Sequence, residues 1–212
     1  MSVEFSDTTL SLREALLRTT ESIRGTPVTL RRLIELIGEQ GLLLLCALLS
    51  VPFLIPVSIP GVSTVFGLAI ILIAMGITAN RAPWLPRQIM DREIDGDKLA
   101  GVLARGAAVV ARIETVIRPR ITALTQGAAM NRFNGLVIIL GGVLLMMPLG
   151  LVPFSNTLPA FAILLLCIGM AQRDGLLVLA GYVMTIVTIL YFLVLFYLAV
   201  AAGMGIATFF RG

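Results

Sequence analysis

The chain of 212 residues contains no histidine, only two cysteines and a charged share of only 13%. Histidine is the commonest metal ligand and general base, and Cys46 and Cys167 lie far apart, so we expect no transition-metal site. Both cysteines lie in apolar runs, where a free thiol usually behaves as a small hydrophobic group. The apolar segments also lack a Gly-rich phosphate loop, a nucleophile–base arrangement and paired carboxylates. The sequence therefore predicts a protein that is not an enzyme and holds no metal or cofactor.

What the chain has in abundance is apolar residues. They make up 58% of the sequence, and the mean hydropathy is +1.01. Soluble domains have apolar and charged shares nearer a half and a quarter, so we predict one integral membrane domain over residues 1–212. The first 40 residues carry eleven charges and no apolar h-region, so we expect no cleaved signal peptide. The net charge of +4 is modest and indicates membrane topology rather than a nucleic-acid partner.

A proline-rich stretch interrupts the first long apolar run. Pro52, Pro56 and Pro60 follow one another at a spacing of four, and Gly61 comes directly after them. Each proline removes a backbone donor and clashes with the preceding turn, so a straight helix cannot continue through them. Non-helical backbone at membrane depth is tolerated only where protein or water satisfies it. A second apolar run is broken in the same way by three further prolines: Pro148, Pro153 and Pro159.

The two breaks are related by a shift of 93 positions. The shift pairs Pro60 with Pro153, Ser63 with Asn156, Thr64 with Thr157 and Gly76 with Gly169. We interpret this as an internal duplication, with repeat 1 over residues 41–79 and repeat 2 over 135–171. Interrupted apolar segments at corresponding positions of two halves point to a transporter-type site. The alternative is that each break is only the tight turn of a helical hairpin.

Segment lengths leave the membrane topology open. About twenty helical residues cross the hydrocarbon core, so the arms at 41–59 and 61–79 are barely long enough. Re-entrant half-helices that meet inside the bilayer are therefore an alternative to full spans. The C-terminal segment, residues 176–210, would be about 50 Å long as one helix. It either tilts and projects from the bilayer or breaks near Gly203-Met204-Gly205. Its aromatic residues, which include Tyr191 and Tyr197, are candidates for an interfacial belt.

The remaining segments are polar and amphipathic. Residues 1–37 predict two amphipathic helices, with Thr29 as a possible N-cap of the second. Residues 80–134 form a polar middle segment, with an amphipathic helix expected over 98–124. Burying its arginines in a membrane span would be costly. We therefore expect the middle helix to lie on the membrane surface, the two N-terminal helices to lie there or to pack on a partner subunit, and the whole protein to be all-α.

The distribution of Lys and Arg predicts the orientation. Five of the 16 precede the first arm, nine lie in the middle segment, and Arg173 lies in a charged turn, residues 172–175. The break loops, residues 56–62 and 149–157, have none. By the positive-inside rule, the N-terminus, the middle segment and the charged turn are cytoplasmic, in a multi-pass protein. Both repeats then enter and leave on the cytoplasmic side and are parallel; an unexpected crossing between them would invert one.

Hydroxyl and amide side chains at the breaks are the best candidates for a substrate site. Helix N-termini that follow the breaks would direct positive dipole ends at an anion, although the same side chains can simply cap those helices. The candidates are Ser58, Ser63, Thr64, Ser155, Asn156 and Thr157. Charges at the ends of the hairpins can pair and lock them, gate access, or serve as solvated anchors: Glu39, Arg81, Arg132, Arg173 and Asp174.

The same motifs resemble those of the bacterial ExoD exopolysaccharide-synthesis family. The resemblance rests on Gly38-Glu39-Gln40-Gly41, the proline series that ends in Gly61-x-Ser63-Thr64, Pro83-Trp84-Leu85-Pro86, Pro153-Phe154-x-Asn156-x-Leu158-Pro159-Ala160 and Arg173-Asp174-Gly175-Leu176. It covers roughly residues 25–200. The family pattern favours Arg where Gln40 stands and Glu where Gln172 stands, so roles for those two charges are in doubt here.

The resemblance implies a bacterial inner-membrane protein that affects exopolysaccharide production, without supplying a reaction. The duplicated breaks favour a transporter or flippase for a lipid-linked or small polar substrate. The charge-free breaks and the long amphipathic helices favour the alternative, a scaffold or regulator of the polysaccharide assembly machinery. We expect membrane lipids and possible assembly proteins as partners. Small-residue helix faces also predict a homodimer or larger assembly, through Gly67, Gly76, Gly141, Gly142 and Gly181.

Overall fold

The computed structural model describes residues 12–55, 61–79, 91, 93–114, 120–147 and 152–209, and this part of the chain is mostly helical. The helical class predicted from the sequence is confirmed. The helices are α1 (Leu12–Ile23), α2 (Leu30–Ser50), α3 (Val62–Ala79), α5 (Gly96–Glu114), α6 (Ala128–Leu145), α7 (Thr157–Ala171) and α8 (Gly175–Phe209). Short 3-10 turns η1 (Val51–Leu54) and η2 (Thr122–Leu124), and strands β1 (Val28–Thr29) and β2 (Glu93–Ile94), connect them.

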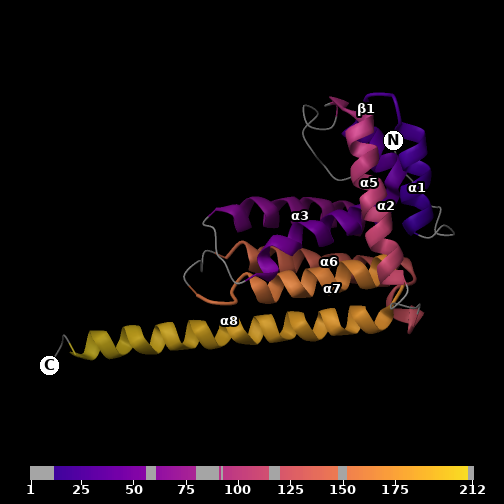
Figure 1. Ribbon diagram of the computed structural model, residues 1–212. Coiled ribbons are helices and arrows are strands. Elements are labelled where there is room, and N and C mark those ends of the chain that lie inside the picture. The colour runs from indigo at the N-terminus through magenta and orange to yellow at the C-terminus, as the bar shows by residue number, and fades with distance from the viewer. Residues whose placement is uncertain are drawn as a thin grey trace.

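Helices α1 and α5 and the β1–β2 ribbon form a polar module beside the bundle. The two helices pack along each other and bury apolar side chains that include Leu16, Ile23 and Ala107. A Cβ added at Gly96 would lie 2.2 Å from the carbonyl oxygen of Ile23, so this contact requires glycine. The amphipathic helices expected to cover a bilayer or a partner subunit therefore cover each other within one chain. In Figure 1 both stand across the direction of the bundle helices.

Helix α2 joins the polar module to the bundle through a bend. Its first residues follow β1, and Thr29 caps it as predicted, with the side-chain oxygen accepting from the Arg32 N–H at 3.3 Å. Gly38 then departs from helical geometry, with φ 64° and ψ −159°. Glycine tolerates this left-handed conformation without the steric cost that a Cβ imposes. The second amphipathic helix and the start of the first apolar arm are thus two parts of α2 that meet at Gly38.

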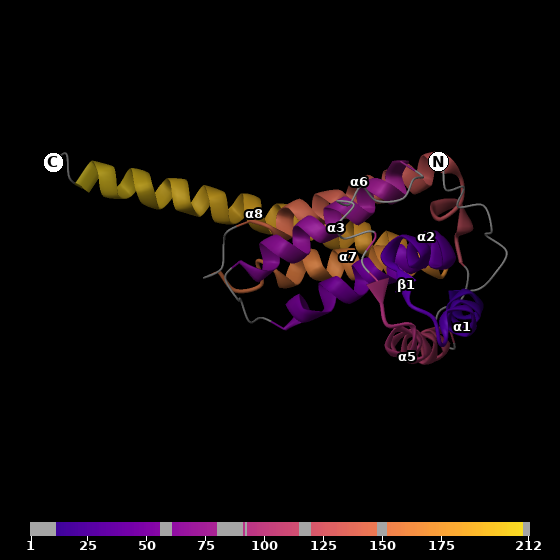
Figure 2. The same cartoon turned by 90° about the horizontal axis from the view of Figure 1, so that it is seen from above.

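The bundle consists of α2 after Gly38, η1, α3, α6, α7 and α8, which run along a common direction in Figures 1 and 2. Helix α7 is central and packs on α2, α6 and α8, while α3 packs on α6. The part of α2 that follows Gly38 and the helix α6 meet near their starts, because Asn131 donates to Glu39 across them. Both hairpins therefore enter the bundle from one end, which we call the charged end. The opposite end, where the chain reverses between the arms, is the break end.

Glycines allow close contact between these helices. An added Cβ at Gly67 would lie 3.0 Å from the Gly142 carbonyl oxygen, one at Gly141 would meet Ile163, and one at Gly181 would meet Leu166. Four of the five glycines proposed to face another subunit, namely these three and Gly142, thus pack within one chain. The homodimer stays a prediction without that support.

Three described helices are long and apolar enough to cross a membrane: Val62–Ala79, Ala128–Leu145 and Gly175–Ala201. The apolar helices Gly38–Leu54 and Thr157–Ala171 are shorter. The C-terminal helix α8 is continuous to Phe209, so the predicted alternative of a break near Gly203 is wrong. Figures 1 and 2 show α8 extending far beyond the other bundle helices.

Candidate functional site at the helix breaks

The first break is built by proline and glycine. Pro52 lies at the start of η1, directly after α2, and is exposed. Gly61 has φ +84°, and its carbonyl oxygen accepts the Val65 N–H at 3.3 Å in the first turn of α3. Ser63 is buried and Thr64 is exposed, so of these two only Ser63 faces the interior of the bundle. Three other predicted break and site residues, Pro56, Ser58 and Pro60, lie outside the described residues.

The second break buries its polar residues more completely. Ser155 is 2% exposed, Asn156 8% and Thr157 7%, and the Ser155 hydroxyl donates to the Val152 carbonyl oxygen at 2.9 Å. Phe154 adopts the left-handed φ of 63°, which is unusual for a side chain of this size. Predicted break residue Pro148 lies outside the described residues, and Pro153 is an exposed turn residue. Pro159 lies in the first turn of α7, where its missing N–H costs little, and therefore does not break the helix.

Asn156 occupies the N-cap position of α7, but its side chain makes no capping hydrogen bond. The interpretation of Asn156 as a capping side chain therefore does not account for its amide. In the first turn of α7 the Leu158 N–H donates to the Phe154 carbonyl oxygen and the Ala160 N–H to the Asn156 carbonyl oxygen, both at 3.1 Å, so it is the positive end of the helix dipole that faces this break. Buried polar groups and a positive helix end thus meet at the start of the central helix of the bundle.

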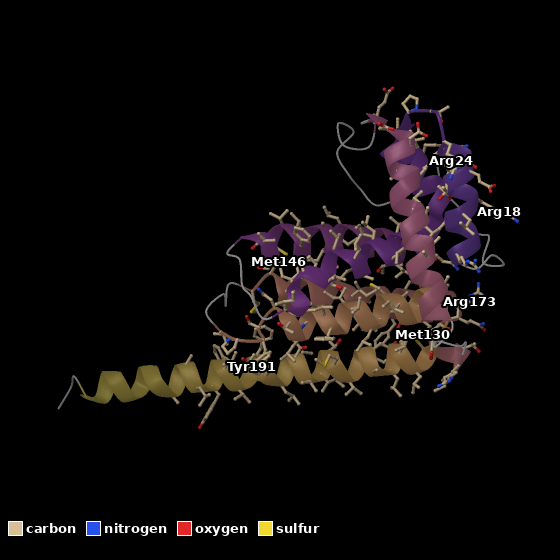
Figure 3. The ribbon with its side chains drawn as sticks, in the orientation of Figure 1. Arg18, Arg24, Met130, Met146, Arg173 and Tyr191 are labelled. Carbon is tan, nitrogen blue, oxygen red and sulfur yellow. The ribbon has the colours of Figure 1, made fainter. Side chains whose placement is uncertain are left out.

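Helix α8 holds the second break through a tyrosine. The Tyr191 hydroxyl donates to the Pro153 carbonyl oxygen at 2.6 Å, and Figure 3 shows this side chain beside the break. The sequence suggested Tyr191 only as part of an aromatic belt at the membrane interface. Its contact with a residue 38 positions away had no local signal, because only the packing of α8 beside the second break brings the two residues together.

The charged end contains a second polar cluster that the sequence did not reveal. Asn134 is completely buried, donates to the Leu124 carbonyl oxygen at 2.9 Å and accepts from the Tyr182 hydroxyl. It therefore ties η2 and α8 to the start of α6. Glu39 Oε1 accepts from Asn131 Nδ2 at 2.6 Å. Burial raises the pKa of Glu39, and the hydrogen bond from Asn131 offsets part of that increase.

The charged residues predicted at the ends of the hairpins lie mainly in turns and contacts that hold the fold together. Asp174 is buried, and its Oδ1 accepts the Leu176 N–H at 2.9 Å in the first turn of α8. Gly175 donates to the Arg120 carbonyl oxygen at 2.6 Å, and an added Cβ would lie 2.2 Å from the Ile121 carbonyl oxygen. Arg173 adopts φ 54° in the tight turn that the sequence predicted at 172–175. Arg132 is exposed, and Arg81 lies outside the described residues.

Comparison with known proteins identifies the family. The chain matches the family model described as exopolysaccharide synthesis, ExoD, over residues 12–194. It belongs to the ExoD family. It is 60% identical over 210 residues to Protein ExoD of Rhizobium meliloti, covering 99% of this chain and 88% of that protein. It is also 29% identical over 164 residues to an uncharacterized protein of Synechocystis sp., covering 77% and 76% of the two chains. No solved structure matches. The ExoD resemblance predicted from the sequence motifs is confirmed, and with it an involvement in exopolysaccharide synthesis.

Proposed function

We propose that this ExoD protein is a transporter or flippase for a lipid-linked or small polar substrate of exopolysaccharide production, with its site at the helix breaks. The observation that carries the proposal is the position along the length of α8 at which the second break lies. The Tyr191–Pro153 hydrogen bond fixes that position, since Tyr191 is near the middle of the 35-residue helix.

The length of α8 supports a position of this break inside the bilayer. From Gly175 to Tyr191 the helix rises about 24 Å, and from Tyr191 to Phe209 about 27 Å. If α8 is centred on the membrane, Pro153 lies near the midplane. If Gly175 instead lies at the edge of the hydrocarbon core, Pro153 lies about 24 Å deep in a core of about 30 Å. Both placements support a second break within hydrocarbon, and hence a re-entrant second hairpin.

Polar groups at such a depth favour transport. Buried polar groups are stable in hydrocarbon only where they bind one another, water or a substrate, and those of the described residues have partners within the protein. Ser155, Asn156 and Thr157 lie buried at the N-terminus of α7, whose dipole favours an anionic group such as a phosphate. Discontinuous helices whose N-termini face an anionic substrate at mid-membrane are typical of secondary transporters.

The alternative function, a scaffold or regulator of the assembly machinery, is favoured by the polar module. Helices α1 and α5 form a self-packed pair at the charged end of the bundle, with exposed residues that include Arg13, Arg18 and Arg24. Figure 3 shows Arg18 and Arg24 on the outer side of the module, away from the bundle. By the positive-inside rule we assign this module and the N-terminus to the cytoplasm and the protein to the bacterial inner membrane. We also retain a homodimer as a proposal.

A reconstitution experiment separates the two functions. The purified protein is placed in vesicles with a labelled lipid-linked saccharide, and exposure of the saccharide on the opposite leaflet is measured with an impermeant oxidant. We expect Asn156→Leu and Ser63→Ala to abolish this exposure while the protein still folds. The matched control is Thr64→Val, because Thr64 neighbours Ser63 but is exposed. Two results together would favour the scaffold. Vesicles with the wild-type protein would show no translocation, and deletion of the α1–α5 module would abolish exopolysaccharide production.

A further inference from the structure

We propose that Glu39 is a reversible proton-binding site that controls the seam between the two hairpins at the charged end of the bundle. The carboxyl joins the start of the first apolar arm to the start of α6 through its 2.6 Å hydrogen bond with Asn131. This site lies at the end opposite the breaks, and the inference does not depend on the proposed transport.

Because of its position, a change in the charge of Glu39 affects the packing of the elements around it. It directly follows Gly38, where α2 bends from the polar module into the bundle. It is only half-buried, so protons reach it from the charged end. A change at this carboxyl therefore acts at once on the hydrogen bond between Glu39 and Asn131 and on the bend that carries the polar module.

Within the described part of the chain, Glu39 has little compensation for a negative charge. Of the elements that pack on α2, β1, η1 and α3 carry no charged side chain, and α7 is charged only at the turn that follows it. Arg132 neighbours Asn131 on α6 but is exposed. Among the described residues, burial raises the pKa of Glu39 and the Asn131 amide lowers it. The remaining charges on these elements, several of them exposed, are Arg13, Glu14, Arg18 and Glu21 on α1, Arg31, Arg32 and Glu35 on α2, and Arg173 after α7.

The Asn131 amide suits both protonation states of its partner. An N–H donor can bond to a carboxylate oxygen or to the carbonyl oxygen of a neutral carboxyl, so protonation keeps this bond. The neutral form can stay buried in the seam, whereas the ionised form requires water around it. Release of the proton to solvent therefore draws water to the contact between Glu39 and Asn131 and loosens the hairpins at this end, and uptake of the proton closes that contact.

Labelling with dicyclohexylcarbodiimide tests proton binding on the wild-type protein. This apolar reagent modifies protonated carboxyls in apolar surroundings, and peptide mass spectrometry locates the adduct. We expect Glu39 to be labelled up to a higher pH than exposed Glu93 in the same digest. Replacing Asn131 with Leu should move the Glu39 curve to still higher pH, because the amide lowers the pKa. No label on Glu39, or a curve that coincides with that of Glu93, would overturn the proposal.

Cysteine accessibility tests the control of the seam. Gln40→Cys places a thiol beside Glu39, and exposed Arg132→Cys is the control, while native Cys46 and Cys167 are completely buried. The maleimide reaction rate of Gln40→Cys, divided by that of Arg132→Cys, should rise over the pH range in which Glu39 loses its carbodiimide label. In a Glu39→Gln background the ratio should stay flat. A ratio with the same pH dependence in both backgrounds would contradict the proposal even if Glu39 binds protons.

Discussion

The Tyr191 hydroxyl lies 2.6 Å from the carbonyl oxygen of Pro153 and thereby fixes the second helix break to the middle of the longest helix. The position of the second break along α8 can therefore be compared with the thickness of a bilayer. The helix continues for about 27 Å beyond Tyr191, which supports the proposed position of the break within the membrane.

Removing that hydroxyl should loosen the break. Tyr191→Phe keeps the ring and deletes one hydrogen bond, which typically contributes about 0.5–1.5 kcal/mol. For a chain of this size we expect the melting temperature to fall by roughly 2–4 °C per kcal/mol. Tyr197→Phe is the matched control, because Tyr197 is 71% exposed on the same helix and should change nothing. Equal effects of the two substitutions would show that Tyr191 does not hold the break.

Gly175→Ala should be strongly destabilising. The added Cβ would meet the Ile121 backbone oxygen at 2.2 Å, and backbone cannot move aside as a flexible side chain can. Overpacking of this kind costs about 1–3 kcal/mol. Gly101→Ala in α5 is the control, because nothing lies within 4 Å of its added Cβ. There the higher helix propensity of alanine should stabilise the protein slightly. Thermal melts of both variants in the same detergent test this prediction. An unchanged melting temperature of Gly175→Ala would contradict the close approach of Gly175 to the Ile121 carbonyl oxygen.

The buried Asn134 should couple energetically to Tyr182. Asn134→Leu leaves the Leu124 carbonyl oxygen and the Tyr182 hydroxyl without this partner, which we expect to cost about 1–3 kcal/mol. Tyr182→Phe removes only one of these bonds and should cost less. A double-mutant cycle measured by thermal unfolding should then be non-additive by at least about 0.5 kcal/mol. Additive effects would mean that the two side chains act separately.

Stability should depend on pH through Glu39. Its pKa in the folded state lies above the ordinary 4.5, because burial disfavours the charged form. The folded state therefore binds more protons, and the stability that Glu39 contributes is complete below 4.5 and is lost as pH rises through the folded-state pKa. Glu39→Gln keeps an acceptor for Asn131 and removes this loss. The melting temperature of the variant relative to wild type should consequently rise from pH 4 to pH 8, and a constant difference would contradict the shift.

The sequence predicts elements better than it predicts contacts. Proline, glycine and the N-cap Thr29 act on their own neighbourhood, so the breaks, the turn at 172–175 and the helical class follow from local chemistry. Asn134, Tyr182 and Tyr191 bind partners 10, 48 and 38 positions away. A single polar residue in an apolar run indicates that a partner is needed, but packing decides which partner it finds.

The pairing of α1 with α5 escaped prediction for a related reason. An amphipathic pattern identifies the apolar face of a helix, but a bilayer, another subunit and another helix of the same chain can each cover it. Gly96 closes the contact, because only a residue without Cβ fits beside the Ile23 carbonyl oxygen. The sequence around it looks like an ordinary turn, so that requirement becomes visible only when α1 and α5 meet.

The depth of the second break in the bilayer tests the central claim most directly. Phe154→Cys offers an exposed site at the break for a fluorescent label, and Arg132→Cys is the reference at the charged end. The labelled protein is reconstituted with lipids that carry a nitroxide quencher either at the headgroup or deep in the acyl chain. We predict that the label at Phe154→Cys is quenched most by the deep nitroxide and the reference most by the headgroup nitroxide. Strongest quenching of Phe154→Cys by the headgroup nitroxide would contradict a break within the hydrocarbon core.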